Sequence, residues 1–469
     1  MPLTTHQKQL VTANREQYPE IYPLLNFVEP RMARQQQTYR DELLGRLASA
    51  RFHLECHQTK PHTGPLSPGC RLCALGSWSC LFVNGRCNLD CFYCPSRQDE
   101  IGQPTTNNLT FRSPAAYVAY LKAFNFQGMS LSGGEPLLTL NRTLDYLKAV
   151  KKQFGSRLHC WLYTNGSLLT PEIAAQLRDN GLDEIRFDIG ALGYALDKLE
   201  LAVGVIPTVT VEIPAVPEDR ELLKTRLHAM DQLGVDFLNL HQLRLTPHNW
   251  PRFARRPYSY LHGEKITVLE SELTALELML YAQQQQLRLP VNYCSFIYKN
   301  RYQTVAARSR GAHIHRRPQE EITEAGYLRS CVISGSRVHL EPLVQRLRDA
   351  DVPAEFWELS ASAQQLFLTP AALPYLDASS LNLTLSYGET PVRASLSYRH
   401  PFREIKLTTD QKVAVERVKA LELTLPVTSA GDFFAELATG KDGASFEGHD
   451  LWRQLLPYEK LQRGLQYYF

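Results

Sequence analysis

Three cysteines with the spacing C-x3-C-x2-C place the strongest constraint on what this chain can fold into. Cys87, Cys91 and Cys94 lie within one short segment. Three thiolates this close together can ligate three irons of a 4Fe–4S cube, which leaves the fourth iron without a protein ligand. Such an open iron can bind a substrate and pass an electron to it. Structural zinc sites usually take their ligands as two separated pairs, so the triplet favours a cluster over zinc.

Four further cysteines precede the triplet and predict a second metal site. They lie in a stretch from 51 to 80 that is rich in glycine and proline, and they are Cys56, Cys70, Cys73 and Cys80. We expect this stretch to have little regular structure of its own. One C-x2-C pair among four thiols suits either zinc or an auxiliary iron–sulfur cluster. The alternative is that the four are separate core residues, because free cysteine is often buried.

The composition is that of an ordinary globular protein in a reducing compartment. Seven of the ten cysteines fall between Cys56 and Cys94, which is typical of metal ligands rather than of a disulfide framework. A net charge of +3 over 469 residues gives no overall attraction to nucleic acid or to a membrane surface. Residues 1–20 do not form a signal sequence, and no apolar run has the length of a membrane span. We therefore expect a cytoplasmic protein of two or three domains.

A short β-rich run, a turn and an amphipathic helix alternate between residues 77 and 245. This alternation is typical of a parallel sheet built from βαβ crossovers. Ser113-Pro114 and Thr170-Pro171 each combine an N-cap with a proline at the first helical position. The predicted fold class is therefore α/β. The expected strands are 78–84, 128–132, 157–164, 183–189, 205–213 and 236–243.

Polar residues follow these strands, at the end of a parallel barrel where catalytic chemistry is usually placed. The cysteine triplet follows the first strand, and Ser132-Gly133-Gly134-Glu135-Pro136 follows the second. The third strand ends in Tyr163-Thr164-Asn165-Gly166. The candidates at the remaining strand ends are Asp188, Glu212, Asn239, His241 and Gln242. The alternative for each of them is that it satisfies exposed backbone groups at the end of its strand.

The cysteine triplet with Tyr93 and the downstream Gly-Gly-Glu-Pro motif resemble the radical S-adenosylmethionine (SAM) superfamily. The likeness covers roughly residues 68–310. The runs Leu81–Cys87 and Leu182–Phe187 resemble a poorly characterised subgroup related to pyruvate formate-lyase activating enzyme. The resemblance implies a partial (β/α)6 barrel whose 4Fe–4S cluster is held by Cys87, Cys91 and Cys94.

The resemblance also implies which residues contact SAM. The backbone of Tyr93 would lie against the adenine, Gly133 and Gly134 would let the backbone approach the methionine part, and Glu135 would pair with the amino group. Thr164 and Asn165 would contact the ribose and the carboxylate. The other candidate cofactor contacts are Pro136, Asp188, Glu212, Asn239 and Gln242.

Segments on both sides of the barrel are expected to add a helical cap and a C-terminal domain. Residues 1–50 predict two helices separated near Pro30, and residues after 260 predict an amphipathic helix over 264–286 and a strand over 287–293. Strand-like runs at 381–387 and 393–398 accompany helix-like runs at 340–347 and 413–421. The expected domains are an N-terminal helical and cysteine-rich extension, 1–76, the barrel, 77–310, and a C-terminal α+β domain for substrate recognition, 320–469.

Cys294 is the candidate catalytic residue outside the motifs, because it ends the extra strand and would meet the same rim as the cluster loop. A thiol there could return a hydrogen atom to a substrate radical or ligate a metal, and Tyr293 and Lys299 would lie close by. The alternative is a small buried residue. The arginines that follow the barrel are expected to form a solvated basic face; they are Arg252, Arg255 and Arg256.

The predicted activity is reductive cleavage of SAM to methionine and a 5′-deoxyadenosyl radical, which removes hydrogen from a peptide or protein. The large C-terminal part without catalytic motifs favours such a substrate, and an electron donor such as flavodoxin or ferredoxin is the expected partner. The alternatives are cobalamin-dependent radical methyl transfer, a small-molecule radical SAM enzyme, and a non-enzymatic iron–sulfur or zinc scaffold. No separate N-terminal domain of a size to hold cobalamin is evident, and the Gly-Gly-Glu-Pro motif argues against a scaffold.

Overall fold

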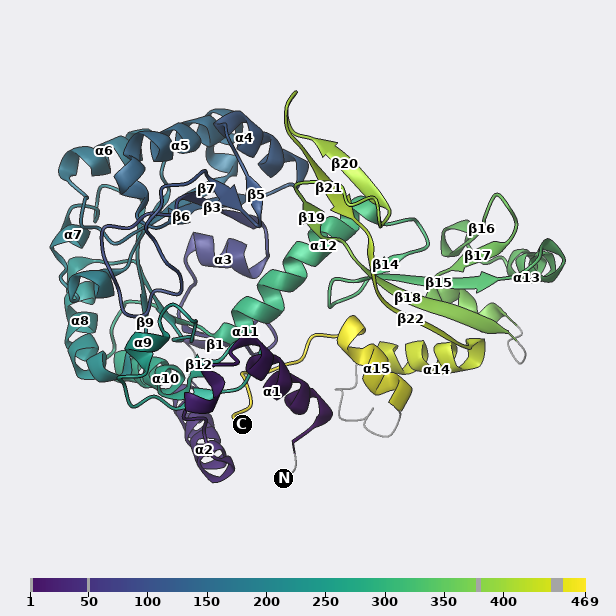
Figure 1. The fold of residues 1–469 in the computed structure, drawn as a ribbon, viewed down its shortest axis with the longest axis horizontal. Coiled ribbons are helices and arrows are strands. Elements are labelled where there is room, and N and C mark those ends of the chain that lie inside the picture. Colours follow the sequence, from purple (N-terminus) through teal and green to yellow (C-terminus); the bar gives the residue numbers. More distant parts are fainter. Residues whose placement is uncertain (1–2, 49–50, 377–380, 440–449) are drawn as a thin grey trace. The chain divides into compact units, whose positions relative to one another are not determined.

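The computed structural model describes residues 3–48, 51–376, 381–439 and 450–469, and the chain forms two compact units (Figure 1). Unit 1 comprises Met1–Gln303 together with Arg463–Phe469, and unit 2 comprises Thr304–Gln462. In this division the first 76 residues belong to the same unit as the barrel, and the functional boundaries expected from the sequence stay predictions. No described helix is both long enough and apolar enough to cross a membrane.

Unit 1 is built on a curved sheet whose central strands are all parallel (Figure 1). Neighbouring strands pair in the spatial order β13-β10-β9-β8-β7-β6-β3. The strands are β3 (Trp78–Asn84), β6 (Gly128–Gly133), β7 (His159–Thr164), β8 (Glu184–Phe187), β9 (Thr208–Pro214), β10 (Phe237–His241) and β13 (Val291–Cys294). The predicted α/β class and partial barrel are confirmed, and the extra strand before Cys294 joins the parallel sheet.

Helices connect these strands and cover the outside of the sheet (Figure 1). They are α4 (Pro114–Ala123), α5 (Leu140–Phe154), α6 (Pro171–Asp179), α7 (Asp197–Glu200), α8 (Arg220–Leu233), α9 (Trp250–Phe253) and α10 (Leu269–Gln284). The two predicted caps are present, because Ser113 Oγ accepts from Ala116 N and Thr170 Oγ1 accepts from Ile173 N. The prediction of an amphipathic α10 is wrong, because eleven of its residues are buried where it packs against α8 and α2 (Pro30–Leu47).

The stretch from 51 to 76 is regularly structured, contrary to the expectation. It forms β1 (Phe52–Glu55), β2 (Lys60–Thr63) and α3 (Pro68–Ala74). β2 runs antiparallel to β13, with Thr63 opposite Val291 and His62 opposite Asn292. The prediction failed because the free edge of β13 supplies hydrogen-bond partners to β2, and the local sequence does not reveal that edge. At the opposite edge of the sheet, β4 (Thr105–Thr106) pairs with β3 and with β5 (Leu109–Thr110).

Helix α3 lies inside the ring of strands (Figure 1). Ser67 caps it by accepting from Cys70 N at 3.1 Å. Gly69 N donates to Glu184 Oε2 at 3.0 Å, and a Cβ on this glycine would stand 2.9 Å from the same oxygen and 3.2 Å from the Trp161 ring. A glycine is therefore required for α3 to come this close to the inner face of the sheet.

A buried ion network holds α3 in this position. Glu184 is fully buried, and its carboxylate accepts from Arg186 Nε at 2.8 Å and lies 3.0 Å from His159 Nε2. Arg186 also donates to Glu212 Oε2 at 2.7 Å and to Ser67 Oγ at 3.1 Å. Burial by itself raises the pKa of Glu184, but Arg186 and His159 outweigh this effect and bring that pKa to about 2. Glu184 is therefore ionised in the folded protein.

The N-terminal helices and the end of the chain close unit 1. α1 (Thr5–Gln17) and α2 are the two helices predicted over 1–50, and Pro30 occupies the first turn of α2 as expected. Arg40 Nη1 donates to Gln466 O at 2.5 Å, and Tyr468 Oη donates to Glu272 Oε1 at 2.6 Å. The last seven residues therefore pack against α2 and α10.

Unit 2 is an α+β domain, as predicted. Its larger sheet has the order β16-β17-β15-β18-β22 and is antiparallel throughout. Its strands are β14 (Glu321–Ile322), β15 (Leu328–Ser334), β16 (Trp357–Leu359), β17 (Gln365–Leu368), β18 (Asn382–Glu389) and β22 (Val418–Pro426). A smaller sheet contains β19 (Val392–Arg393), β20 (Phe402–Lys406) and β21 (Lys412–Glu416). The helices are α12 (Thr304–His315), α13 (Arg337–Asp349), α14 (Val427–Ala438) and α15 (Asp450–Glu459).

Two local predictions in unit 2 are wrong. Residues 413–421, predicted as helix, belong to β21 and β22, because β22 pairs along its length with β18 and this long-range pairing overrides helix propensity. The strand predicted over 393–398 ends after Arg393. The strand at 381–387 and the helix at 340–347 are present as β18 and α13.

We predict that Glu184→Gln destabilises unit 1 by about 3–5 kcal/mol, because it leaves the buried Arg186 without its closest carboxylate. Urea unfolding followed by tryptophan fluorescence, to which Trp161 beside Arg186 contributes, measures the change. Because the pKa of Glu184 is depressed, its contribution is complete above pH 4.5 and is lost as the pH falls toward about 2. The difference in unfolding free energy between wild type and Glu184→Gln should therefore become smaller as the pH falls from 4.5 toward about 2.

Asp179→Asn is the matched control, because the Arg178–Asp179 pair is exposed at the end of α6. This variant should unfold at nearly the wild-type urea concentration. Equal stability of wild type and Glu184→Gln at pH 7 would show that the network does not hold the fold.

Candidate active site

The cysteine triplet forms a loop directly after β3, at the C-terminal end of that strand. Cys87, Cys91 and Cys94 are each partly exposed, and Cys94 N donates to Cys91 O at 3.1 Å. Cys87 and Cys94 line a pocket of about 340 Å³. The other residues that line it are Asn88, Leu89, Asp90, Ser96, Arg97, Gln98, Asp99 and His248. Three accessible thiols beside an open pocket are a donor set that fits a cluster with one iron free of protein ligands.

Two arginines after the barrel hold this loop. Arg252 Nη2 donates to both Asp90 oxygens at 2.6 and 2.7 Å, and Arg252 Nη1 donates to Cys91 O at 3.0 Å. The Arg256 guanidinium lies 3.6 Å from the centre of the Phe92 ring. The expectation that these residues form only a solvated face is therefore wrong, because the fold of the loop between β10 and α10 brings them onto the cysteine loop.

The Gly-Gly-Glu-Pro segment is bonded directly to the backbone that precedes the triplet. Gly134 N donates to Asn84 O at 3.0 Å, and Glu135 N donates to Arg86 O at 2.8 Å. Gly133 has φ +127°, and a Cβ on either glycine would overlap the backbone of Asn84 or Arg86. The glycines are therefore needed for the two loops to lie side by side.

Glu135 ties the end of β6 to the end of β7. Its side chain is fully buried and accepts from Leu137 N at 3.0 Å, Thr164 Oγ1 at 2.9 Å and Asn165 N at 2.7 Å. Burial raises the pKa of Glu135, and these hydrogen bonds oppose that rise. Pro136 follows it at the start of a buried turn, Pro136–Thr139.

Asn165 links the same group to the cysteine loop. Its Nδ2 lies 3.6 Å from Cys87 Sγ and donates to Asn88 Oδ1 at 3.0 Å. Thr164 is bonded to Glu135 and accepts from Gly166 N at 2.9 Å. The structure therefore brings Thr164, Asn165 and Glu135 together beside the triplet, as their places after neighbouring strands predict.

Tyr93, which lies between two cysteines of the triplet, contacts Asp188. Tyr93 Oη donates to Asp188 at 2.9 Å, and Tyr93 O accepts from Asn249 Nδ2 at 3.4 Å. Burial raises the pKa of Asp188 to about 6, against the opposing effect of the Tyr93 hydroxyl. This carboxyl therefore titrates closer to neutral pH than an exposed aspartate does.

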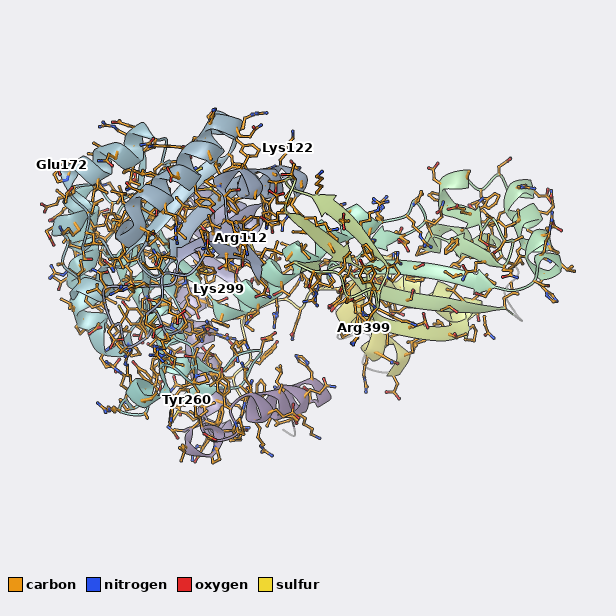
Figure 2. All side chains as sticks on the ribbon, turned by 45° about the horizontal axis from the view of Figure 1, so that its top comes forward. Arg112, Lys122, Glu172, Tyr260, Lys299 and Arg399 are labelled. Atoms are coloured by element: carbon orange, nitrogen blue, oxygen red, sulfur yellow. The ribbon has the colours of Figure 1, made fainter. Side chains whose placement is uncertain are left out.

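A second polar group lies at the ends of β9, β10 and β13. Glu212 Oε1 is 2.6 Å from His241 Nε2, and Lys299 Nζ is 2.7 Å from His241 Nδ1. Glu212 also accepts from Asn239 Nδ2 at 3.0 Å. Burial raises the pKa of Glu212. The opposite effect of the neighbouring basic groups is larger, so this pKa lies well below its usual range; these groups are Arg186, His241 and Lys299. Figure 2 labels Lys299, which begins the helical turn Lys299–Gln303.

Cys294 joins this group. Its charged neighbours are His241, Lys60 and Lys299. Burial raises the pKa of Cys294, but the two lysines and His241 outweigh it and bring that pKa to about 6. Tyr293 is not beside it, because alternate residues of a strand face opposite sides and Tyr293 Oη bonds Glu272 of α10 at 2.8 Å.

Gln242 is bonded to backbone rather than to the other candidates. Its Nε2 donates to Val268 O at 3.4 Å, and its Oε1 accepts from Phe296 N at 3.4 Å. These contacts match the alternative in which a polar residue satisfies backbone at the end of its strand.

Three of the four upstream cysteines lie around Lys60, while Cys80 lies on β3 beside the hydroxyls of Ser130 and Ser132. The three are Cys56, Cys70 and Cys73. Nothing in the local sequence marked Lys60, since a single lysine on a short strand carries no pattern. Among the described residues, no three His, Cys, Asp or Glu side chains lie close enough together to share one metal ion.

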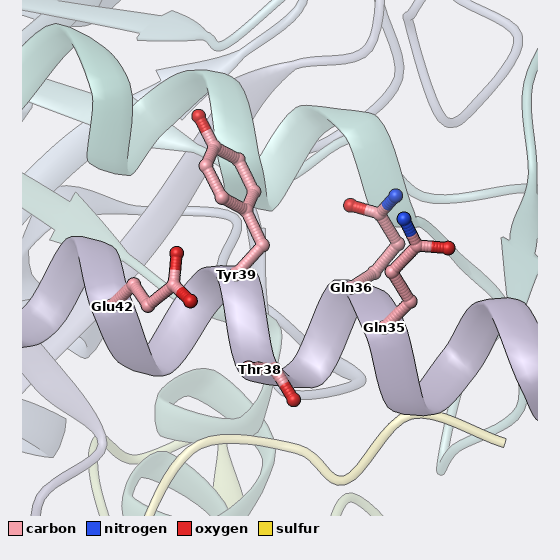
Figure 3. A pocket seen from close by; sticks show the side chains of 5 residues that line it. All are labelled: Gln35, Gln36, Thr38, Tyr39 and Glu42. Atoms are coloured by element: carbon pink, nitrogen blue, oxygen red, sulfur yellow. The ribbon is translucent and has the colours of Figure 1, made fainter.

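A second pocket, of about 540 Å³, lies along α2 and carries none of these groups (Figure 3). It is lined by Gln35, Gln36, Thr38, Tyr39 and Glu42. Figure 3 shows Tyr39 pointing toward α10, where its hydroxyl donates to Glu277 at 2.8 Å. All of its lining residues come from one helix and none is a thiol, so we place the active site at the triplet.

Comparison with known proteins supports the same assignment. The sequence model of the radical SAM superfamily matches residues 81–200. A protein of Methanocaldococcus jannaschii named "Putative glycyl-radical enzyme activating enzyme" is 29% identical over 304 residues, which are 62% of this chain and 80% of that protein. A GTP 3′,8-cyclase of Synechococcus sp. is 36% identical over 118 residues, 24% of this chain and 33% of the relative.

Among solved structures, Streptococcus suis SuiB bound to S-adenosylmethionine overlaps 62% of this chain and 61% of its own, with a TM-score of 0.32 and 12% identity. This overlap carries no further weight. The family match and the motifs show a radical SAM domain over residues 81–200, and the chain is an enzyme related to the activating enzymes of glycyl-radical enzymes. The cofactors of this family are a 4Fe–4S cluster and SAM.

We predict that Gly134→Ala lowers the iron bound at the triplet roughly tenfold, because its Cβ would overlap Arg86 O and stand 2.7 Å from Cys87 N, pushing the cysteine loop aside. Iron content and visible absorption after anaerobic reconstitution measure this. Gly45→Ala is the control, because nothing lies within 4 Å of its Cβ on α2. Normal iron content in Gly134→Ala would mean that the close approach of the two loops is unimportant.

Proposed function

We propose that this enzyme cleaves SAM reductively at a cluster held by Cys87, Cys91 and Cys94, and that the resulting 5′-deoxyadenosyl radical removes hydrogen from a peptide or protein. The observation that carries the proposal is the bonded unit formed by the triplet, the Gly-Gly-Glu-Pro segment and the end of β7. Asn165 N donates to Glu135 Oε2 at 2.7 Å, and Asn165 Nδ2 lies 3.6 Å from Cys87 Sγ, so the cluster and SAM would be held by one bonded unit.

Each residue of this frame has a proposed role. The three thiolates hold the cluster and leave one iron for SAM, whose cleavage is the chemistry that the cofactors supply. Gly133 and Gly134 present backbone to the methionine part, and Glu135 accepts from its amino group. The remaining proposed contacts are Tyr93 to the adenine and Thr164, Asn165 and Asp188 to the ribose and carboxylate.

Glu212 and Asn239 have a different proposed place. Glu212 is already bonded to Arg186, His241 and Asn239, and Asn239 also accepts from Asn292 Nδ2 at 2.8 Å. Because both residues belong to the polar group of β9, β10 and β13 and not to the bonded unit of the triplet and Glu135, we assign them to the inner wall that orients a substrate rather than to SAM. Gln242 and Pro136 support the neighbouring backbone.

A protein or peptide substrate is favoured by the name of the M. jannaschii relative, which describes activation of a glycyl-radical enzyme. Hydrogen removal from a glycine Cα is therefore the proposed step. Unit 2, which carries none of the site motifs, would serve in recognition, and a flavodoxin or ferredoxin would supply the electron.

The wild-type enzyme, reconstituted anaerobically and given dithionite and SAM, should release 5′-deoxyadenosine, and Cys91→Ala should reduce this release to background. The reason is that two thiolates cannot hold the cluster. Chromatography measures the product. Cys331→Ala is the control, because Cys331 is buried in the sheet of unit 2. Release by Cys91→Ala at the wild-type rate would exclude the proposed cluster site.

The same assay tests the substrate class. Peptides that carry deuterium at glycine Cα should transfer it to 5′-deoxyadenosine, whereas peptides deuterated only in alanine should not. Deuterium appearing from the alanine peptides alone would contradict abstraction from glycine.

Glu135→Gln should weaken SAM binding about tenfold or more, because a carboxylate that accepts from an ammonium group is replaced by a neutral amide. Equilibrium binding of SAM to the reconstituted protein measures the change, and iron content confirms that the cluster is present. Glu172→Gln is the control, since Glu172 is exposed at the start of α6 (Figure 2). An unchanged affinity in Glu135→Gln would move the SAM site elsewhere.

A further inference from the structure

Four thiols from three separate segments lie in the neighbourhood of one buried lysine inside unit 1. Cys56 follows β1, Cys70 and Cys73 lie on α3, and Cys294 ends β13. All four lie within electrostatic range of Lys60. Cys73 is likewise within range of Cys70 and Cys294, and Cys56 is within range of Cys73 and Cys294. The fold therefore gathers into one group thiols that the sequence separates by more than two hundred positions.

Lys60 needs a negative partner. Its side chain is 1% exposed, and its ammonium lies 4.0 Å from the centre of the Tyr298 ring. In the described part of the chain no carboxylate pairs with it, and its attractive partners are the four thiols. An unpaired buried ammonium is costly, and a negatively charged group held by these thiols would balance it.

Hydrogen-bond donors are directed at the same sulfur atoms. Cys73 Sγ accepts from Gln303 Nε2 at 3.1 Å and from Tyr298 Oη at 3.4 Å. Asn292 Nδ2 lies 4.0 Å from Cys70 Sγ. A neutral thiol is a weak acceptor, whereas donors around sulfur are a regular feature of iron–sulfur sites, where they tune the reduction potential.

The spacing of the thiols excludes a single ion. The triplet of Cys87, Cys91 and Cys94 also does not form a group close enough to share one metal ion in the described residues. A cubane spreads its cysteine ligands over different irons, so its thiolates lie farther apart than the ligands of one zinc ion. Neither the thiol group around Lys60 nor the triplet therefore has the close ligand spacing of a site for a single ion.

We propose that Cys56, Cys70, Cys73 and Cys294 bind a second iron–sulfur cluster of the 4Fe–4S type, with Lys60 as its counter-charge. Four thiolates around such a cluster leave it negatively charged, which the ammonium of Lys60 compensates. The proposal includes Cys294 in place of Cys80, and it makes Cys294 a cluster ligand rather than a hydrogen donor. It does not depend on the radical chemistry, because all four irons would have protein ligands.

The test begins with the variant in which Cys87, Cys91 and Cys94 are all replaced by alanine. After anaerobic reconstitution with iron and sulfide, this variant should retain about four irons per chain, against about eight in the wild type. On reduction with dithionite it should give the electron paramagnetic resonance signal of a 4Fe–4S cluster. Adding Cys73→Ser should remove that iron, while adding Cys160→Ala, on β7, should leave it.

Two outcomes of this experiment would overturn the proposal. One is a triple variant that is folded by circular dichroism and holds no iron, and the other is a triple variant that holds zinc instead of iron. Release of 5′-deoxyadenosine by the wild type is measured separately, so failure of the second cluster and failure of the proposed function can be distinguished.

Two measurements keep the proposal testable if Cys73→Ser does not fold. Mössbauer spectra of the wild type should show that SAM changes the signal of no more than half of the iron, because only the cluster at the triplet has an iron open to SAM. Lys60→Met should lower the midpoint potential of the SAM-insensitive cluster, because a positive charge beside it is removed. A spectrum in which SAM changes all of the iron would contradict the second site.

Discussion

The buried ion pairs of Arg186 with Glu184 and Glu212 are the interaction on which the rest of unit 1 depends. Charges inside a protein persist only when each has a partner, and here the partners come from two neighbouring strands. The same groups bond Ser67 and Gly69, so the network also fixes α3 inside the ring of strands. The positions of the thiols on α3 therefore follow from ion pairing, not from an apolar core.

Parallel strand pairing decides which loops meet at the active site. β3, β6 and β7 are neighbours in the sheet, so the loops that leave their C-terminal ends emerge side by side. Hydrogen bonds from Gly134 to Asn84 and from Asn165 to Glu135 then lock the three loops into one unit. A cluster ligated by the first loop and a SAM molecule bound by the other two, as proposed, would thereby be held next to each other.

Much of the barrel could be predicted because its signals are local. Ser113-Pro114 and Thr170-Pro171 mark their helix starts within a few residues, and the glycines of the Gly-Gly-Glu-Pro segment mark a close backbone approach. The failures all involve partners distant in the chain. β2 needs the edge of β13, β22 needs β18, and Arg252 contacts Asp90 across more than a hundred and fifty residues. Propensity and spacing contain no information about such partners.

The sequence by itself determined the class of chemistry, because the spacing of Cys87, Cys91 and Cys94 within one loop allows few ligation patterns and the motif after the next strand is specific. Only the tertiary structure decided how the other cysteines are grouped. Cys294 joins Cys56, Cys70 and Cys73 because β2 adds to the edge of β13 and places Lys60 beside that strand's end. Cys80, although nearer in sequence, lies on β3 beside Ser130 and Ser132. The spacing of cysteines in the sequence determines which of them are neighbours within one loop. Strand pairing and the need to balance a buried charge determine which residues become neighbours when they are distant in the chain.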